Sequence, residues 1–227
     1  FLGEPWRYAR LIDMVGLAAE AGLWVMLNTN ATLLNEGLSE KLLTAGLTDI
    51  FFSFDSPYPE EYEKVRVGAK YEKTLANIKG FMELKERLGR REVQTRASMV
   101  LPEELEGAAL EKVKNDYLRL FRNLGVAEIG FGLPTVMGRD YENKYGLFPG
   151  FVCPDLFRRL FVFWDGPVGP CCGDWERKLI MGDARTDSLA EIWSGKAYRS
   201  LREAHCQDRY ADVPACRACS APYLSTT

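Results

Sequence analysis

The sequence predicts an α/β fold, in which a parallel sheet over residues 1–145 is followed by a small α+β unit over residues 146–227. Three observations support this prediction. A helix-then-strand pattern repeats four times before residue 133, three of the strands carry polar residues at alternate positions, and all six cysteines lie after residue 152. Because successive crossovers join parallel strands, the first part is expected to be an α/β barrel or a doubly wound sheet.

Each of the four repeats has an amphipathic helix that ends at a glycine, followed by a β-rich run. In the first repeat, the apolar residues Leu11, Met14 and Val15 have helical spacing, and Gly22 can occupy the position after the helix. The other three helices are expected to end near Gly46, Gly89 and Gly125. The four strands are expected at residues 23–29, 50–54, 93–100 and 126–131.

Polar residues on three of these strands favour the barrel. Successive residues of a strand point to opposite faces of the sheet, so each of these strands has one polar and one mostly apolar face. Polar residues at the ends of strands can simply be solvated. Matching positions on three strands instead indicate a ligand-binding lumen, because buried polar groups are costly unless a partner satisfies them. The residues expected on this face are Asn28, Asn30, Ser53, Asp55, Gln94, Arg96 and Ser98.

After residue 133 the repeat stops, and the sequence predicts a second unit with little apolar core. A linker rich in glycine and proline spans residues 146–154, and Asp165-Gly166 indicates the tight turn of a hairpin. Ser188 and Glu191 have the spacing of a capping box, at the start of one helix that continues through Leu201. Units this small often need a metal to hold them together.

The cysteines of this unit favour a metal or cluster site over disulfide bonds. A Cys-x-x-Cys pair, Cys216 and Cys219, has further cysteines upstream, and no basic-then-apolar leader opens the sequence. Because His205 is the single histidine, such a site is expected to be rich in sulfur. A four-cysteine zinc site is the alternative to an iron–sulfur cluster, since thiolates bind both.

The composition argues against several other classes of protein. The 29 basic and 32 acidic residues give a net charge of -3, so the chain lacks the excess of positive charge that is typical of nucleic-acid-binding proteins. The longest uncharged apolar runs are far too short to span a membrane. Together with the absence of a recognisable leader, these features predict a cytoplasmic protein that binds neither nucleic acid nor membrane.

Short motifs in the first part resemble, in the same order, those of radical S-adenosylmethionine (AdoMet) enzymes. Leu2-Gly3-Glu4-Pro5 is similar to the Gly-Gly-Glu-Pro segment of that family, with Leu2 in place of the first glycine. The run 28–33 resembles its Thr-Asn-Gly-Thr segment, and the run 53–55 resembles its Ser-x-Asp. The resemblance implies a partial (β/α)6 barrel in which Glu4 accepts a hydrogen bond from the cofactor's ammonium group and Arg96 pairs with its carboxylate. The cofactor-binding residues that it implies are Gly3, Glu4, Asn28, Asn30, Ser53, Asp55 and Arg96.

The second part resembles the auxiliary-cluster domains of the SPASM and twitch types. The run 163–172 is similar to their Asp-Gly-x-Val-x-Pro-Cys hairpin, and Met181-Gly182-Asp183, the run 188–193 and the final Cys-x-x-Cys follow as in those domains. Six cysteines are too few for two clusters, so the resemblance implies a single 4Fe–4S cluster with four thiolate ligands. Cys172 is adjacent to an expected ligand and is not expected to bind the cluster itself, so it is the spare cysteine. Cys206 is the next candidate ligand. The expected ligands are Cys153, Cys171, Cys216 and Cys219.

The resemblance also implies a radical mechanism for the oxidation or maturation of a small molecule or peptide. A second 4Fe–4S cluster, reduced by flavodoxin or ferredoxin, would cleave AdoMet to a 5′-deoxyadenosyl radical that abstracts hydrogen from the substrate, and the auxiliary cluster would accept an electron. The Cys-x-x-x-Cys-x-x-Cys ligands of this second cluster are expected upstream of Phe1, because the motif is absent from the 227 residues. The alternative is a non-catalytic iron–sulfur or zinc scaffold. No catalytic general base can be named from the sequence.

Overall fold

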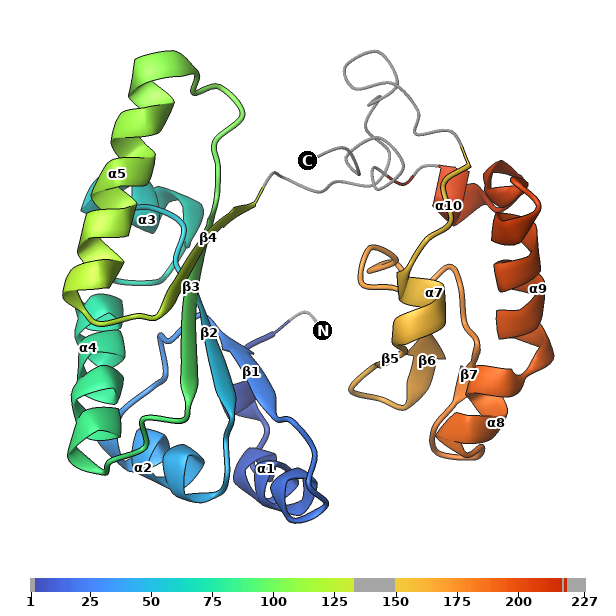
Figure 1. Cartoon of the computed structure of the whole chain (residues 1–227), viewed down its shortest axis with the longest axis horizontal. Helices are drawn as coiled ribbons and strands as arrows, with labels where there is room; N and C mark the ends of the chain where they lie inside the picture. The colour runs from blue at the N-terminus through green and yellow to red at the C-terminus, as the bar shows by residue number, and fades with distance from the viewer. Residues whose placement is uncertain (1–2, 133–149, 218, 220–227) are drawn as a thin grey trace. The chain divides into compact units, whose positions relative to one another are not determined.

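The computed structural model of the protein describes residues 3–132, 150–217 and 219 (Figure 1). The described residues divide into two compact units, an N-terminal unit up to residue 132 and a C-terminal unit from residue 150. The boundary expected between residues 145 and 146, and the first part of the expected linker, lie outside the described residues.

The N-terminal unit is built on a parallel sheet with strand order β1-β2-β3-β4. Each new strand is added beside the previous one, as in a barrel, whereas a doubly wound sheet reverses its strand order. The predicted α/β fold with a parallel sheet is therefore confirmed. The strands are β1 (Met26–Thr29), β2 (Asp49–Ser53), β3 (Gln94–Val100) and β4 (Glu128–Gly132). The helices are η1 (Pro5–Arg7), α1 (Leu11–Glu20), α2 (Glu36–Thr44), α3 (Pro59–Val65), α4 (Tyr71–Arg87) and α5 (Gly107–Asn123).

The apolar face of the sheet packs on the helices, and Figure 1 shows α4 and α5 along that face. The ring of Phe52 meets that of Phe81 on α4 edge to face, with centroids 5.7 Å apart. Phe54 stacks on Tyr62 and also contacts Phe121 on α5 edge to face. Since all five of these rings are buried, the core lies between the sheet and its helices and leaves the opposite face for polar residues.

Two strands are shorter or shifted relative to the sequence prediction. The strand expected at residues 23–29 begins at Met26, and the one expected at 126–131 spans Glu128–Gly132. Before β1, the Val25 N–H donates to the Thr48 hydroxyl at 2.6 Å, and the Val25 carbonyl accepts from the backbone N–H groups of both Thr48 and Asp49. The Thr48 side chain therefore takes the hydrogen bond of Val25 that a regular strand partner would take, and β1 starts only after it. Apolar periodicity in the sequence does not reveal such a side-chain hydrogen bond.

The glycine after α2 lies against α1, which gives a direct test of this packing. Gly46 has φ +101°, and a Cβ at this position would lie 2.5 Å from the Cβ of Ala19. Gly89, after α4, also has positive φ, but a Cβ there has no neighbour within 4 Å. We expect Gly89→Ala to destabilise the unit by about 1 kcal/mol through backbone strain alone. Gly46→Ala should destabilise it by about 2–4 kcal/mol, because strain and overpacking add. Urea unfolding of both variants checks this, and equal losses would contradict the α1–α2 contact.

The C-terminal unit contains a small antiparallel sheet and several short helices. The predicted hairpin is present between β5 and β6, with Gly166 at φ +109° in its turn, and a third strand, β7, pairs with β6. None of its helices, and no other helix among the described residues, is long and apolar enough to cross a membrane. The strands are β5 (Phe161–Val162), β6 (Pro167–Gly169) and β7 (Gly182–Asp183). The helices are α7 (Asp155–Arg158), α8 (Leu189–Ser194), α9 (Lys196–Cys206), η2 (Tyr210–Asp212) and α10 (Pro214–Arg217).

The prediction of one helix from Ser188 through Leu201 was wrong in one respect. The capping box is present, since the Glu191 N–H donates to the Ser188 hydroxyl and the Ser188 N–H donates to the Glu191 carboxylate. The helix, however, stops at Gly195, whose extended backbone (ψ 166°) ends α8 and begins α9. Glycine is a poor helix former, and apolar periodicity that continues across it conceals the break.

Candidate functional site

Polar residues gather on the face of the parallel sheet opposite the helices. In the strand register, Asn28 and Arg96 both pair with Phe51, and Ser53 pairs with Ser98. The neighbouring positions Leu27, Phe52 and Ala97 point to the buried core instead. The structure thus places the strand residues predicted from the alternating pattern on one face, in adjacent rows.

Glu4 is tied to the carboxyl end of β1. One carboxylate oxygen accepts a hydrogen bond from the Thr29 hydroxyl, and the other accepts from the Asn30 N–H at 2.9 Å. The Trp6 indole N–H in turn donates to the Thr29 hydroxyl at 3.2 Å. Burial raises the pKa of Glu4 above its usual value, and the two hydrogen bonds oppose this shift. The alternating sequence pattern placed Thr29 on the apolar face of the sheet and not among the site residues. Its position between two asparagines is the sequence feature that could have identified it.

Two of the other predicted residues already have partners within the chain. Asp55 accepts a hydrogen bond from the guanidinium of Arg66, just after α3, and only 11% of its side chain is exposed. The Asn30 side-chain oxygen accepts from the backbone N–H and the hydroxyl of Thr32, which shapes the turn after β1. Asn28 is exposed and Ser53 is half-buried, so both remain accessible on the polar face, and Gly3 is exposed beside Glu4.

Arg96 lies between two carboxylates on neighbouring strands. Its Nε is 3.0 Å from a carboxylate oxygen of Asp49, and one Nη is 3.2 Å from a carboxylate oxygen of Glu128. Asp49 is only 1% exposed, and this burial raises its pKa despite the attraction of Arg96. The role of Arg96 toward a cofactor carboxylate therefore stays a prediction, since the guanidinium balances a buried charge in this structure.

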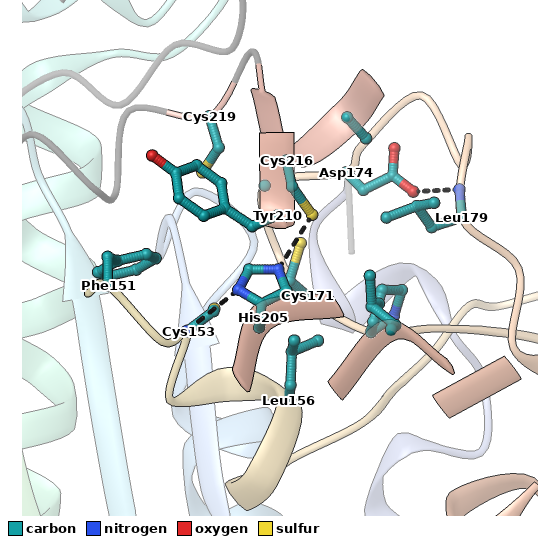
Figure 2. A pocket seen from close by; sticks show the side chains of 14 residues that line it. Phe151, Cys153, Leu156, Cys171, Asp174, Leu179, His205, Tyr210, Cys216 and Cys219 are labelled. Atoms are coloured by element: carbon teal, nitrogen blue, oxygen red, sulfur yellow. Dashed lines mark hydrogen bonds between the residues drawn. The ribbon is translucent and has the colours of Figure 1, made fainter. Parts of the chain in front are cut away.

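The C-terminal unit contains a cavity that four cysteines line together (Figure 2). Cys153 precedes α7, Cys171 follows β6, Cys216 lies on α10, and Cys219 comes three residues later. The rest of the wall is mostly apolar and includes Leu156, Leu201 and Tyr210. Cys172 and Cys206 are exposed and do not line the cavity. The four residues predicted as ligands are thus brought together, whereas Cys172, the expected spare, and Cys206, the next candidate, lie outside the cavity.

The surroundings make these sulfurs poor free thiolates but suitable ligands. Burial raises the pKa of Cys171 to about 11, and burial together with the neighbouring cysteines raises the pKa of Cys216 to about 12. Four thiolates in an apolar pocket repel one another unless a positively charged centre lies between them. The backbone N–H groups of Gly173 and Asp174 lower the pKa of Cys171 and so favour its charged form. The donor set therefore fits an iron–sulfur cluster.

Two further residues of the cavity escaped the sequence reasoning. Asp174 is buried, and its carboxylate accepts from the backbone N–H groups of Lys178 and Leu179 at 2.9 and 2.7 Å, which closes the loop after Cys171. His205 is 3% exposed, and burial lowers its pKa. The sequence signal for His205 was its being the only histidine of the chain.

The family comparison concerns this second site. Residues 153–220 match the model of the SPASM family, described as an iron–sulfur cluster-binding domain. The match contains all six cysteines and begins at Cys153. It covers every residue that lines the cavity except Phe151.

Two curated relatives and several solved structures are similar to the chain. The AdoMet-dependent heme synthase of Methanosarcina barkeri is 35% identical over 77 residues, which cover 34% of this chain and 22% of the relative. The "tungsten-containing aldehyde ferredoxin oxidoreductase cofactor-modifying protein" of Pyrococcus furiosus is 24% identical over 96% of this chain and 72% of the relative. The first match thus spans only about a fifth of that relative's length.

The solved structures share the fold at low sequence identity. BtrN, in complex with AdoMet and 2-DOIA, has a TM-score of 0.57 and 18% identity, over 96% of this chain and 70% of BtrN. SuiB of Streptococcus suis, bound to the precursor peptide SuiA, has a TM-score of 0.65 and 12% identity, over 88% of this chain and 54% of SuiB. The two partners are chemically different, a small molecule in one and a peptide in the other.

Proposed function

We propose, from the premise that this chain joins a parallel α/β unit of the radical AdoMet fold to a SPASM iron–sulfur domain, that it is the larger part of a radical AdoMet enzyme. The observation that carries the proposal is the convergence of Cys153, Cys171, Cys216 and Cys219 on one cavity within the matched domain. When bound, AdoMet and two 4Fe–4S clusters would supply radical chemistry, that is, hydrogen abstraction from the substrate by a 5′-deoxyadenosyl radical and transfer of an electron to the auxiliary cluster that the four cysteines would hold.

The polar face of the parallel sheet is where AdoMet would bind. Accessible polar groups lie at the carboxyl ends of the strands on this face, and ligands of parallel α/β sheets bind outside the carboxyl ends of the strands. Glu4 holds a partly buried carboxylate at the end of β1 and can accept a hydrogen bond from the cofactor's ammonium group. The rest of the proposed binding set is Gly3, Asn28, Asn30, Ser53, Asp55 and Arg96, and Arg96 lies in the same row of the sheet as Asn28.

The cavity of the C-terminal unit favours a cluster over a single zinc ion. A zinc ion needs its ligands about 2.0–2.3 Å from one point. Within the described residues, no three His, Cys, Asp or Glu side chains lie close enough together to hold one metal ion. Sulfurs that surround a cavity instead of meeting at a point suit the larger 4Fe–4S group, which takes four thiolates.

The substrate class that we propose is a small molecule or a peptide, since the similar BtrN and SuiB structures hold one of each. All six cysteines of the chain lie in the C-terminal unit, so the ligands of the cluster that cleaves AdoMet would come from a segment outside these residues. A low-potential flavodoxin or ferredoxin would supply the electron. The cytoplasm, where such reductants work, is the proposed location.

Iron content and electron paramagnetic resonance (EPR) of the full-length protein, purified without oxygen, test this function. We expect about four irons at the C-terminal site and a second reduced cluster whose spectrum changes when AdoMet is added. Glu4→Gln should weaken AdoMet binding about tenfold, because a charge-assisted hydrogen bond is lost, and should leave the iron content unchanged. Zinc in place of iron, or spectra that AdoMet does not alter, would support the non-catalytic scaffold instead.

A further inference from the structure

His205 bridges two of the four cysteines of the cavity. Its Nδ1 lies 3.4 Å from the backbone nitrogen of Cys153, and its Nε2 lies 3.4 Å from the Sγ of Cys216. Figure 2 shows the ring between these two contacts, at the end of α9. Tyr210 packs beside the ring, with centroids 5.7 Å apart, and the ring is almost wholly buried.

These contacts determine which ring nitrogen carries the proton. The Cys153 N–H is a donor only, so Nδ1 has to accept and carries no hydrogen. An imidazole ring without a proton on Nδ1 carries one on Nε2, which faces the sulfur of Cys216. The geometry therefore gives a neutral ring whose Nε2–H points to a cluster ligand.

We propose that His205 is a positioning residue that donates an Nε2–H hydrogen bond to the Cys216 thiolate and thereby raises the reduction potential of the cluster held in the cavity. This inference rests on the proposed function, because it needs an iron–sulfur cluster on the four cysteines. Hydrogen bonds to ligand sulfurs stabilise the more negative, reduced state, and they are among the features that set cluster potentials.

Two of the other ligands in the cavity, Cys171 and Cys153, receive hydrogen bonds from the backbone. The N–H groups of Gly173 and Asp174 face the sulfur of Cys171, and those of Asp155 and Leu156 face the sulfur of Cys153. Cys216 receives its hydrogen bond from a side chain. A substitution can therefore remove the interaction at Cys216 while the backbone of the site stays intact.

A pair of amide substitutions distinguishes the effect of losing this hydrogen bond from the effect of losing the volume of the ring. The amide nitrogen of His205→Gln reaches about as far as Nε2 and can donate to Cys216, whereas the shorter His205→Asn reaches only as far as Nδ1. In an EPR-monitored redox titration, we expect His205→Asn to raise the oxidised-to-reduced ratio of the auxiliary cluster about tenfold at a fixed potential. This corresponds to about 59 mV for a one-electron couple. His205→Gln should stay close to the unsubstituted protein.

The iron content of each variant distinguishes the two proposals. Normal iron in both variants with equal potentials would overturn the role of His205 and leave the cluster in place. Absence of iron from the unsubstituted protein would overturn the proposed function and this inference with it.

A second measurement does not depend on any substitution. Because His205 is the only histidine of the chain, ¹⁵N-histidine labels this ring alone within the 227 residues, provided that no histidine tag is used. In the EPR of the reduced auxiliary cluster, a weak hyperfine coupling to the ¹⁵N label is expected if the ring is hydrogen-bonded to Cys216. A strong coupling, typical of a nitrogen bound to iron, or no coupling at all, would contradict the proposal.

Discussion

Replacing any one of Cys153, Cys171, Cys216 or Cys219 with alanine should remove the auxiliary cluster and loosen the C-terminal unit, while the N-terminal unit stays folded. The four sulfurs line one cavity, and the buried apolar cluster beside it contains little more than Val168, Ile192 and Tyr198. A unit with so small a core depends on a bound metal for much of its folding free energy. We expect the iron at this site to fall to background, and proteolysis within residues 150–219 to become at least about tenfold faster.

The other two cysteines provide matched controls for this experiment. Cys172 is the chain neighbour of Cys171, and Cys206 is the last residue of α9, yet both are exposed and outside the cavity. Alanine at either position should leave iron content and proteolysis close to those of the unsubstituted protein. An intact cluster in Cys171→Ala together with its loss in Cys172→Ala would mean that the ligand is the neighbour.

Arg96→Met should destabilise the N-terminal unit by about 2–3 kcal/mol at neutral pH. Removing one partner of a buried ion pair typically costs about 3–5 kcal/mol. The side chain of Arg96 is 36% exposed, so the loss should be smaller here. Asp49 is 1% exposed, and in the variant its buried negative charge would lose its closest positive partner. Chemical denaturation near pH 7 measures the effect.

The dependence of this loss on pH identifies Asp49 as its source. Burial already raises the pKa of Asp49 in the folded state, and removing Arg96 should raise that pKa further. A carboxyl group whose pKa is raised by folding favours the folded state at low pH and loses that contribution as the pH rises through the folded-state pKa. The deficit of Arg96→Met should therefore shrink as the pH falls below neutral.

Two variants serve as controls for Arg96→Met. Asp49→Asn added to Arg96→Met should recover part of the lost stability, because no buried charge is left. Arg87→Met breaks an exposed pair with Glu36, in which both side chains are more than half exposed, and should change the stability by less than about 1 kcal/mol. Equal losses in Arg87→Met and Arg96→Met would refute the importance of the buried carboxylate.

Much of the fold could be predicted from local patterns. The four predicted helices α1, α2, α4 and α5 each have apolar residues at helical spacing and end just before a glycine, and the strands that follow them alternate, so these element types and the parallel strand direction follow from the sequence. The short helices η1 and α3 were not predicted. The polar face of Asn28, Ser53 and Arg96 followed from the same alternation. The helix break at Gly195 and the short start of β1 did not, because they depend on one backbone conformation and one threonine hydroxyl.

The candidate sites were predictable to different degrees. Cysteine spacing and the hairpin motif indicated the four residues that the cavity brings together. The partners of Arg96 could not be predicted, since Asp49 and Glu128 are far from it in sequence and meet it only through strand register. The contacts of His205 with the cysteines could not be predicted for the same reason, although it stood out as the only histidine of the chain. Its contact with Cys153 joins residues that only the folded α9 brings together.

The placement of the four cavity cysteines also has a consequence for biosynthesis. Cys153 and Cys171 leave the ribosome well before Cys216 and Cys219, and α9 is made between the two pairs. The first two thiols therefore emerge before the cavity that holds them exists. Cluster delivery therefore has to follow translation of the unit, and until then the first two thiols lack the two other ligands of the site.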